Sequence, residues 1–145
     1  MTYNLTKMII ERPAHEVFEA FVDPERISQF WFSSSSCRWE EGKTVTLRYD
    51  EYQAILDIDI LEMVKDQRIV FRWGGDGDPH RITIVLDAVE PASTCIEVTE
   101  EGFKEGDADY IRLLVDNKEG WVYVLTCLKA YLEFGVTRLR AGLVK

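Results

Sequence analysis

Cysteine and histidine are scarce in the sequence, and their spacing excludes several kinds of site. The three cysteines, Cys37, Cys95 and Cys127, are scattered, with no Cys-x-x-Cys pair and no histidine at zinc-ligand spacing. We therefore expect reduced thiols, no metal and no cofactor. Neither His15 nor His80 has a sequence-local partner for acid–base chemistry, so we predict no catalytic residue.

Long apolar runs, a secretion signal and an excess of positive charge are also absent. The longest apolar stretches, such as 121–125, are far too short to span a bilayer, and the first seven residues lack a basic and then apolar layout. Seventeen basic against 26 acidic residues give a net charge of −9, which repels phosphate backbones and anionic membrane surfaces. We therefore expect a cytoplasmic protein that binds neither nucleic acid nor membrane.

The acidic residues lie in short clusters, which indicate solvated loops and outward strand faces. One cluster begins at Glu100–Glu101 and continues to Asp109. Asp76-Gly77-Asp78 is similar to the start of a calcium loop, but the later ligands are missing, and a turn is predicted. The motifs of serine hydrolases, zinc proteases, P-loop enzymes and dinucleotide-binding domains are absent.

The patterns that are present predict one domain, 1–145, of mixed α and β structure. The chain is 46% hydrophobic and 30% charged, which is typical of a globular protein. Apolar periodicity predicts, in order, a strand within 2–12, a helix from Pro13, a short helix over 24–30, five or six antiparallel strands over 44–99, and a long helix starting between Tyr110 and Asn117. A strongly bent sheet could then wrap the long helix.

The long helix has an apolar sector of roughly 220° at 100° per residue, which a flat sheet could not cover. A curved sheet, a cavity or another chain could face the excess. One part of this sector is a second stripe at four-three-four spacing, formed by Tyr123, Cys127, Ala130 and Phe134. This stripe predicts either packing under the curved edge of the sheet or the seam of a homodimer.

Three segments carry a resemblance to a known family. They are "ERPAHEVFEAFVDPERISQFW" (11–31), "ILEMVKDQRIVFRW" (60–73), and Gly120-Trp121 followed by apolar residues at helical spacing. In their order and spacing they resemble the START-like, Bet v 1-like (SRPBCC) superfamily, and within it the domain related to the C-terminal half of the activator of Hsp90 ATPase. The resemblance implies an α+β helix-grip fold (β-α-α-β6-α) with an internal cavity.

The resemblance also implies where a ligand would bind. It places Phe71, Trp73, Trp121, Leu125 and Leu128 at the family's cavity, and the sequence suggests that Trp31 and Phe32 converge there. Aromatic residues in this pattern fit either a filled core or a lined cavity. Arg48, Glu62 and Arg112 are candidate polar residues at its rim, whereas Arg72 falls on the opposite face of its strand.

Relatives in this superfamily include lipid carriers, hormone receptors, cyclases and chaperone partners, so the fold constrains function weakly. The first hypothesis is binding of a hydrophobic or amphipathic small molecule without catalysis. The alternatives are a partner of an Hsp90-type chaperone and a cyclase- or hydrolase-like enzyme. The enzyme would need a titratable side chain inside the cavity.

Overall fold

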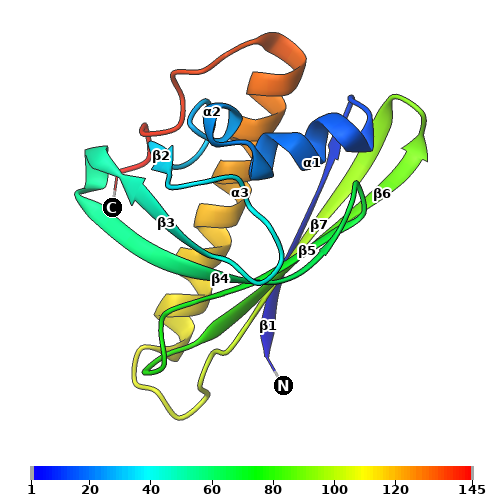
Figure 1. The fold of residues 1–145 in the computed structure, drawn as a ribbon. Coiled ribbons are helices and arrows are strands. Elements are labelled where there is room, and N and C mark those ends of the chain that lie inside the picture. Colours follow the sequence, from blue (N-terminus) through cyan, green and yellow to red (C-terminus); the bar gives the residue numbers. More distant parts are fainter. Residues whose placement is uncertain (1, 145) are drawn as a thin grey trace.

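Seven antiparallel strands bend around one long helix in a computed structural model that describes residues 2–144 (Figure 1). The elements are β1 (Tyr3–Ile10), α1 (Ala14–Val22), α2 (Pro24–Ile27), β2 (Ser34–Ser35), β3 (Thr44–Tyr49), a 3-10 turn η1 (Asp50–Tyr52), β4 (Ala54–Val64), β5 (Arg68–Trp73), β6 (His80–Glu90), β7 (Ser93–Glu101) and α3 (Tyr110–Phe134). The strand order is β1-β7-β6-β5-β4-β3-β2. The predicted α+β helix-grip fold is confirmed.

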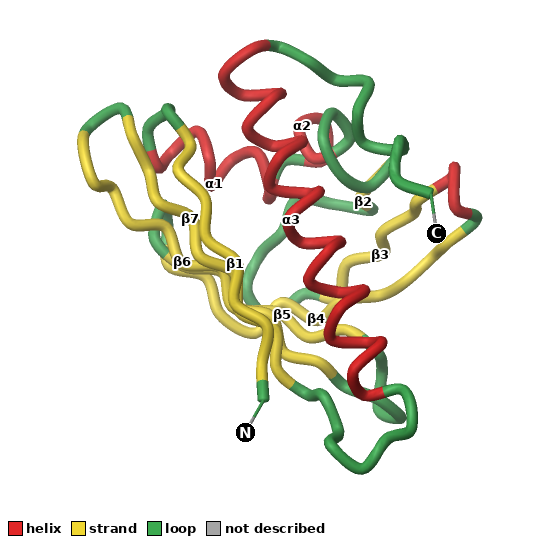
Figure 2. Tube along the Cα trace, turned by 180° about the vertical axis from the view of Figure 1, so that it is seen from behind, coloured by secondary structure: helices red, strands yellow, loops and turns green. Residues whose placement is uncertain are grey.

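The sheet is curved, and α3 lies between its two arms (Figure 2). Strand alternation places one apolar face inward: Phe71 on β5 pairs with Ile82 on β6, and both are fully buried. The register shifts between Ile60 and Glu62 on β4, and a bulge of this kind bends a strand and increases its twist. The curvature gives the wide apolar sector of α3 a partner on more than one side.

The outer edge of β1 has no neighbouring strand and is instead covered by α3. The Lys118 ammonium donates to the Leu5 carbonyl, and the Lys129 ammonium donates to the Ile9 carbonyl at 2.8 Å. These bonds satisfy backbone groups that would otherwise be open for pairing with another chain. The helix is therefore fixed along the sheet edge as well as through its buried face.

The two short helices close one end of the fold. Asp23 caps α2 by accepting from the Glu25 backbone N–H at 2.9 Å, and Pro24 occupies the first turn, where a missing N–H costs nothing. Phe21 of α1 is fully buried and packs edge-to-face on Trp31 with ring centroids 6.0 Å apart. The α1–α2 pair thus positions the start of the following loop against the core.

The segment after α3, residues 135–144, runs back past α2 and β2 toward η1 (Figure 1). Gly135 ends the helix in a left-handed conformation (φ 68°), and the Tyr123 hydroxyl donates to the Leu139 carbonyl. The predicted second stripe is consequently divided. Cys127 is buried in the core, Tyr123 lies half-buried beside the returning segment, and Phe134 is 73% exposed.

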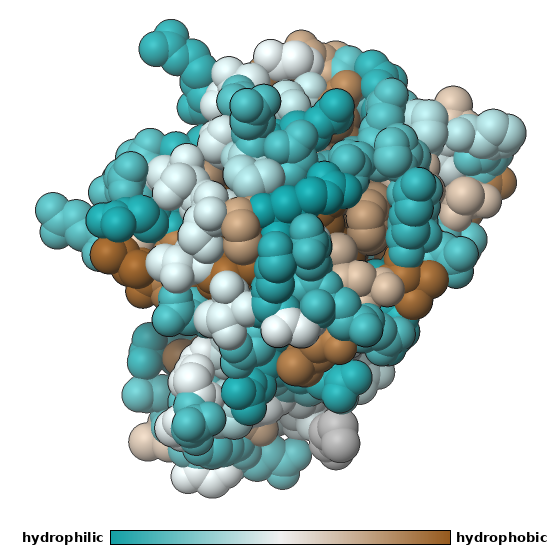
Figure 3. Space-filling model, in the orientation of Figure 1, coloured by the Kyte–Doolittle hydropathy of each residue, from teal (hydrophilic) through white to brown (hydrophobic). Residues whose placement is uncertain are grey.

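Most of the face seen in Figure 3 is hydrophilic, with only small separated apolar areas, as expected for a chain with 30% charged residues. Among residues 2–144, no helix is both long enough and apolar enough to cross a membrane.

Candidate ligand-binding cavity

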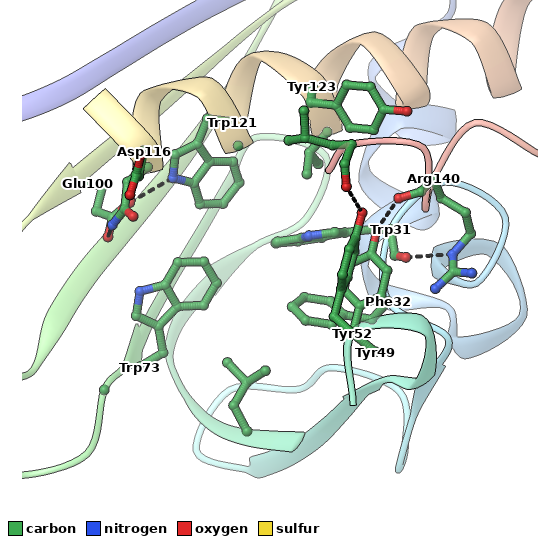
Figure 4. Close-up of a pocket in the computed structure, with 16 residues that line it drawn as sticks. Trp31, Phe32, Tyr49, Tyr52, Trp73, Glu100, Asp116, Trp121, Tyr123 and Arg140 are labelled. Carbon is green, nitrogen blue, oxygen red and sulfur yellow. Dashed lines mark hydrogen bonds between the residues drawn. The ribbon is translucent and has the colours of Figure 1, made fainter. Parts of the chain in front are cut away.

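A cavity of about 660 Å³ lies between α3 and the concave side of the sheet, closed on one side by the α2–β2 loop and the segment 135–144. Its volume is within the range of small-molecule sites, roughly 300–1,000 Å³. Seven aromatic residues dominate its lining (Figure 4): Trp31, Phe32, Tyr49, Tyr52, Trp73, Trp121 and Tyr123.

Three tryptophans from distant segments form a continuous wall of this cavity. Trp73 at the end of β5 stacks on Trp121 of α3 with centroids 5.7 Å apart and planes 19° apart. Trp31 from the loop after α2 contacts both, at 6.4 and 5.3 Å. Trp31 and Trp121 are almost completely buried and Trp73 is half-buried, so these rings are held in place and would lose little side-chain freedom on binding.

A buried carboxylate holds the orientation of Trp121. Glu100 of β7 is 0% exposed and accepts from the Trp121 indole N–H at 2.8 Å and from the Asn117 amide at 2.9 Å. Its other close contact is with His80 Nδ1 at 2.7 Å, and the His80 ring packs on Phe103. Trp121 bonds to Oε1, and Asn117 and His80 contact Oε2, so both carboxylate oxygens are held in place. The network therefore sets the angle of the indole at the cavity wall.

The prediction that the cluster beginning at Glu100 is solvated is therefore wrong for Glu100 itself. The residue continues the inward alternation of Ile96 and Val98 on β7, and its charge is accommodated by hydrogen bonds instead of water. The expectation that His80 has no local partner is wrong, because its Nε2 lies 3.7 Å from Asp78. Its closer partner is Glu100, twenty residues away across the β6–β7 pair.

Arg140 closes the opposite end of the cavity. Its guanidinium donates to the Trp31 carbonyl at 2.6 Å, to Glu51 at 2.6 Å and to the Ser33 hydroxyl at 2.9 Å. It also lies 4.8 Å from the centre of the Tyr49 ring. The hydrogen bond from Arg140 lowers the pKa of Glu51 to about 2.

Two tyrosine hydroxyls attach the returning segment to the sheet side of the cavity. Tyr49 donates to the Arg140 carbonyl, and Tyr52 donates to the Leu143 carbonyl at 2.5 Å. Burial raises the pKa of Tyr49 well above its usual value, which keeps the hydroxyl protonated as a donor. The segment 135–144 is therefore part of the cavity wall, and Arg140 and Leu143 are among its lining residues.

The structure brings four of the seven predicted ligand-binding residues to the lining. These are Trp31, Phe32, Trp73 and Trp121. The other three, Phe71, Leu125 and Leu128, are completely buried in the core and lie outside the lining.

The polar residues expected at the rim do not line the cavity either. Each takes part in an exposed ion pair: Arg48 with Asp50, Glu62 with Arg68, and Arg112 with Asp109. Arg112 also pairs with Asp116, which does line the cavity. Arg72 lies outside the cavity lining and pairs with Asp59 of β4 at 2.9 Å.

The sequence interpretation missed the polar residues that do line the cavity, chiefly Glu100, Asp116, Asn117 and Arg140. The alternation of β7 indicates the position of Glu100, because Glu100 follows Ile96 and Val98 at two-residue spacing and so lies on the same inward face. Arg140 follows the end of the helix in a segment without periodicity, so no local pattern could place it. Within residues 2–144, no group of three or more potential metal ligands comes together.

The sheet bends around a long C-terminal helix and leaves a cavity between them. This arrangement defines the helix-grip class, as the resemblance implies. The model of the family described as Activator of Hsp90 ATPase homolog 1-like protein matches residues 11–133, and the chain belongs to this family. No curated protein matches the sequence.

Solved structures share the fold over nearly the whole chain. A protein from Staphylococcus saprophyticus is 51% identical, with a TM-score of 0.82 over 94% of this chain and 95% of its own. The Aha1 dimer from Colwellia psychrerythraea is 17% identical (TM-score 0.81; 93% and 98% covered). DynU16, a protein of the dynemicin biosynthetic locus, is 23% identical (TM-score 0.80), and the match covers 95% of this chain but 49% of that one.

Proposed function

We propose that the protein binds a hydrophobic or amphipathic small molecule in the cavity between the sheet and α3. The observation that carries this proposal is a cavity of about 660 Å³ lined by seven aromatic residues, in a place that core side chains could have filled instead. Apolar cavities with a few polar groups at defined places are the usual form of small-molecule sites. Glu100 and Arg140 supply such groups at its two ends.

Two other functions remain candidates on specific observations. The family match supports a role as partner of an Hsp90-type chaperone, which would use the outer surface of the domain. A cyclase- or hydrolase-like reaction would use the two carboxylates of the lining, Glu100 and Asp116. A second copy of the chain is a further candidate partner, since a relative of the same fold was solved as a dimer.

Native mass spectrometry of freshly purified protein, compared with the same sample denatured, is the first test. A reproducible extra mass that is lost on denaturation supports the binding proposal and gives the mass of the occupant. The same spectrum reports whether the protein is a monomer or a dimer. An apo mass leads to the direct titration described next.

The direct test is fluorescence titration with N-phenyl-1-naphthylamine, an uncharged apolar probe. Trp73→Ala removes a half-buried ring from the cavity wall and is expected to weaken binding by about tenfold, the value of one aromatic contact plus its lost area. Tyr3→Ala is the control, because Tyr3 is an aromatic residue that is 51% exposed on β1 outside the lining. Equal affinity of wild type and Trp73→Ala, both folded by circular dichroism, would overturn the proposal.

The chaperone alternative gives the opposite pattern. Binding to an Hsp90-family chaperone would persist in Trp73→Ala, because the change lies inside the cavity. A pull-down that retains the chaperone in both proteins, together with no binding of the uncharged probe by wild type, would favour that function.

A further inference from the structure

We infer that the ligand of the cavity is an uncharged apolar molecule that carries a carbonyl oxygen, and that the indole N–H of Trp31 donates a hydrogen bond to this oxygen. The apolar body of the ligand lies against the tryptophan rings of the cavity wall. This inference rests on the proposed function and specifies its ligand class.

Trp31 is an almost completely buried residue whose one polar side-chain atom lacks a partner. The residue is 5% exposed and lines the cavity. Within residues 2–144 its indole N–H donates to no other group, and no dashed line reaches it in Figure 4. Nearly all buried N–H groups in proteins are hydrogen-bonded, because leaving one unpaired costs free energy. Such a donor in a cavity wall therefore indicates an acceptor that the chain itself does not supply.

Two other tryptophans show what distinguishes Trp31. Trp121 is buried to the same degree, at 4% exposed, and its N–H is bonded to Glu100 at 2.8 Å. Trp39 Nε1 is unpaired as well, but it is enclosed in the core and Trp39 lies outside the lining, so no ligand can reach it. Trp31 Nε1 is not enclosed in this way, so open space lies beside it. In Figure 4 this nitrogen lies on the part of the ring that extends toward Trp73 and Trp121.

The other aromatic donors of the lining are either used or within reach of solvent. Each of the three lining tyrosines has one hydroxyl proton and donates it to a carbonyl of the segment 135–144. Trp73 also has an unpaired N–H among the described residues, but its side chain is only half-buried, so solvent reaches the residue. Trp31 is therefore the aromatic donor whose partner has to come from a bound molecule.

An uncharged acceptor fits this lining better than a carboxylate. Arg140 is the single Lys or Arg among the described lining residues, and its guanidinium donates to Glu51, to Ser33 and to the Trp31 carbonyl. A carboxylate that moved from water to the Trp31 N–H would lose its hydration without gaining a free counter-charge. The net charge of −9 adds a long-range repulsion of anions. A ketone, ester or amide carbonyl accepts the same hydrogen bond without these costs.

Three probes that share a naphthalene body test the inference by displacement of N-phenyl-1-naphthylamine at pH 7. The probe 2-acetylnaphthalene carries the carbonyl, 2-isopropenylnaphthalene has a CH2 group of similar size in place of the oxygen, and 2-naphthoate is the anion. The carbonyl preference is defined as the Kd of the hydrocarbon divided by the Kd of the ketone. The naphthoate is expected to bind at least about tenfold more weakly than the ketone.

Trp31→Phe keeps an apolar ring and the backbone carbonyl that binds Arg140, but it removes the N–H. It is expected to reduce the carbonyl preference about fivefold, which corresponds to one hydrogen bond of about 1 kcal/mol. The ketone and the hydrocarbon lose the same ring contact, so their ratio reports the hydrogen bond alone. Trp39→Phe is the matched control, because it removes an unpaired indole N–H outside the lining and should leave the preference unchanged.

Proton–nitrogen NMR of the wild-type protein reports on the same bond without any substitution. The ketone should move the Trp31 indole proton downfield relative to its position with the hydrocarbon, because only the ketone accepts from it. The Trp121 indole proton, which is already bonded to Glu100, should have the same position with both probes. Equal Trp31 positions with the two probes would overturn the inference, even if Trp31→Phe did not fold.

The outcomes distinguish this inference from the proposed function. An unchanged carbonyl preference in folded Trp31→Phe, an equal loss in Trp39→Phe, or tighter binding of the naphthoate than of the ketone would overturn the uncharged carbonyl class. Each of these results would leave the cavity as a binding site. No binding of N-phenyl-1-naphthylamine or of any of the three probes would count against the proposed function itself.

Discussion

Gly120 offers a sharp test of whether the cavity is used. It lies inside the 25-residue helix α3 and belongs to the cavity lining. A glycine in a helix interior is less stable than alanine by about 1 kcal/mol. Apart from its two chain neighbours and the nearby backbone of its own helix, a Cβ added at Gly120 would meet nothing within 4 Å, so close packing does not require glycine here. The residue keeps space open at a cost in stability.

Two substitutions at Gly120 should separate stability from binding. Gly120→Ala should raise the free energy of unfolding by about 1 kcal/mol, or the melting temperature by roughly 3 °C for a chain of this size. Gly120→Leu gains most of the same helix propensity and extends into the cavity. Overfilling typically costs 1–3 kcal/mol, so the bound probe should lose about 2 kcal/mol, roughly thirtyfold in Kd.

The assays are urea unfolding and titration with N-phenyl-1-naphthylamine. Thr126→Leu is the control, because Thr126 is exposed on the same helix and leucine has the higher helix propensity. It should gain stability without losing affinity. Wild-type affinity in Gly120→Leu would refute the binding site, and a destabilised Gly120→Leu would show that the space beside Gly120 is already filled.

Two further predictions concern the segment that closes the cavity. Arg140→Ala removes three hydrogen bonds and should lower the free energy of unfolding by about 2 kcal/mol in urea titrations. Arg138 is an exposed neighbour, and Arg138→Ala should change the free energy of unfolding little. Equal effects of the two substitutions would contradict a closing role for Arg140. The pKa of Glu51 falls from 4.5 to about 2 on folding, so the carboxylate stabilises the protein above pH 4.5 and loses this effect as the pH drops toward 2. The stability difference between wild type and Glu51→Gln should therefore be largest near neutral pH and shrink between pH 4.5 and 2, and a constant difference would exclude the Glu51–Arg140 contact as its source.

Periodicity was sufficient to predict the elements whose burial is set by near neighbours in the sequence. The alternation of β5 and β6 and the three-four spacing of α1 each predict one buried face, and the structure has these faces buried. On β5, Val70 of the opposite face is buried as well. Residue type was a poorer guide than parity for Glu100. Its charge predicts a position in solvent, although its place in the alternation of β7 is inward.

Segment 135–144 could not be placed because its position depends on contacts between residues far apart in the sequence. Arg140 reaches Trp31, Ser33 and Glu51, all of which precede it by 89 residues or more. No local period encodes such contacts. The wide apolar sector of α3 gave an indirect indication that something besides the sheet must cover it, and part of that cover is this segment.

The presence of a cavity is the part of the site that aromatic composition alone could not reveal. Trp73 and Trp121 would stack in the same way in a filled core, because ring contacts depend on burial and not on the space beyond the rings. Gly120 is a more informative residue. It stands between Glu119 and Trp121 in a helix that continues fourteen residues further, so it cannot be a C-terminal cap, and a helical conformation does not need glycine. A glycine with neither conformational nor packing cause, next to the central tryptophan of an apolar face, indicates that the face must leave room for something else.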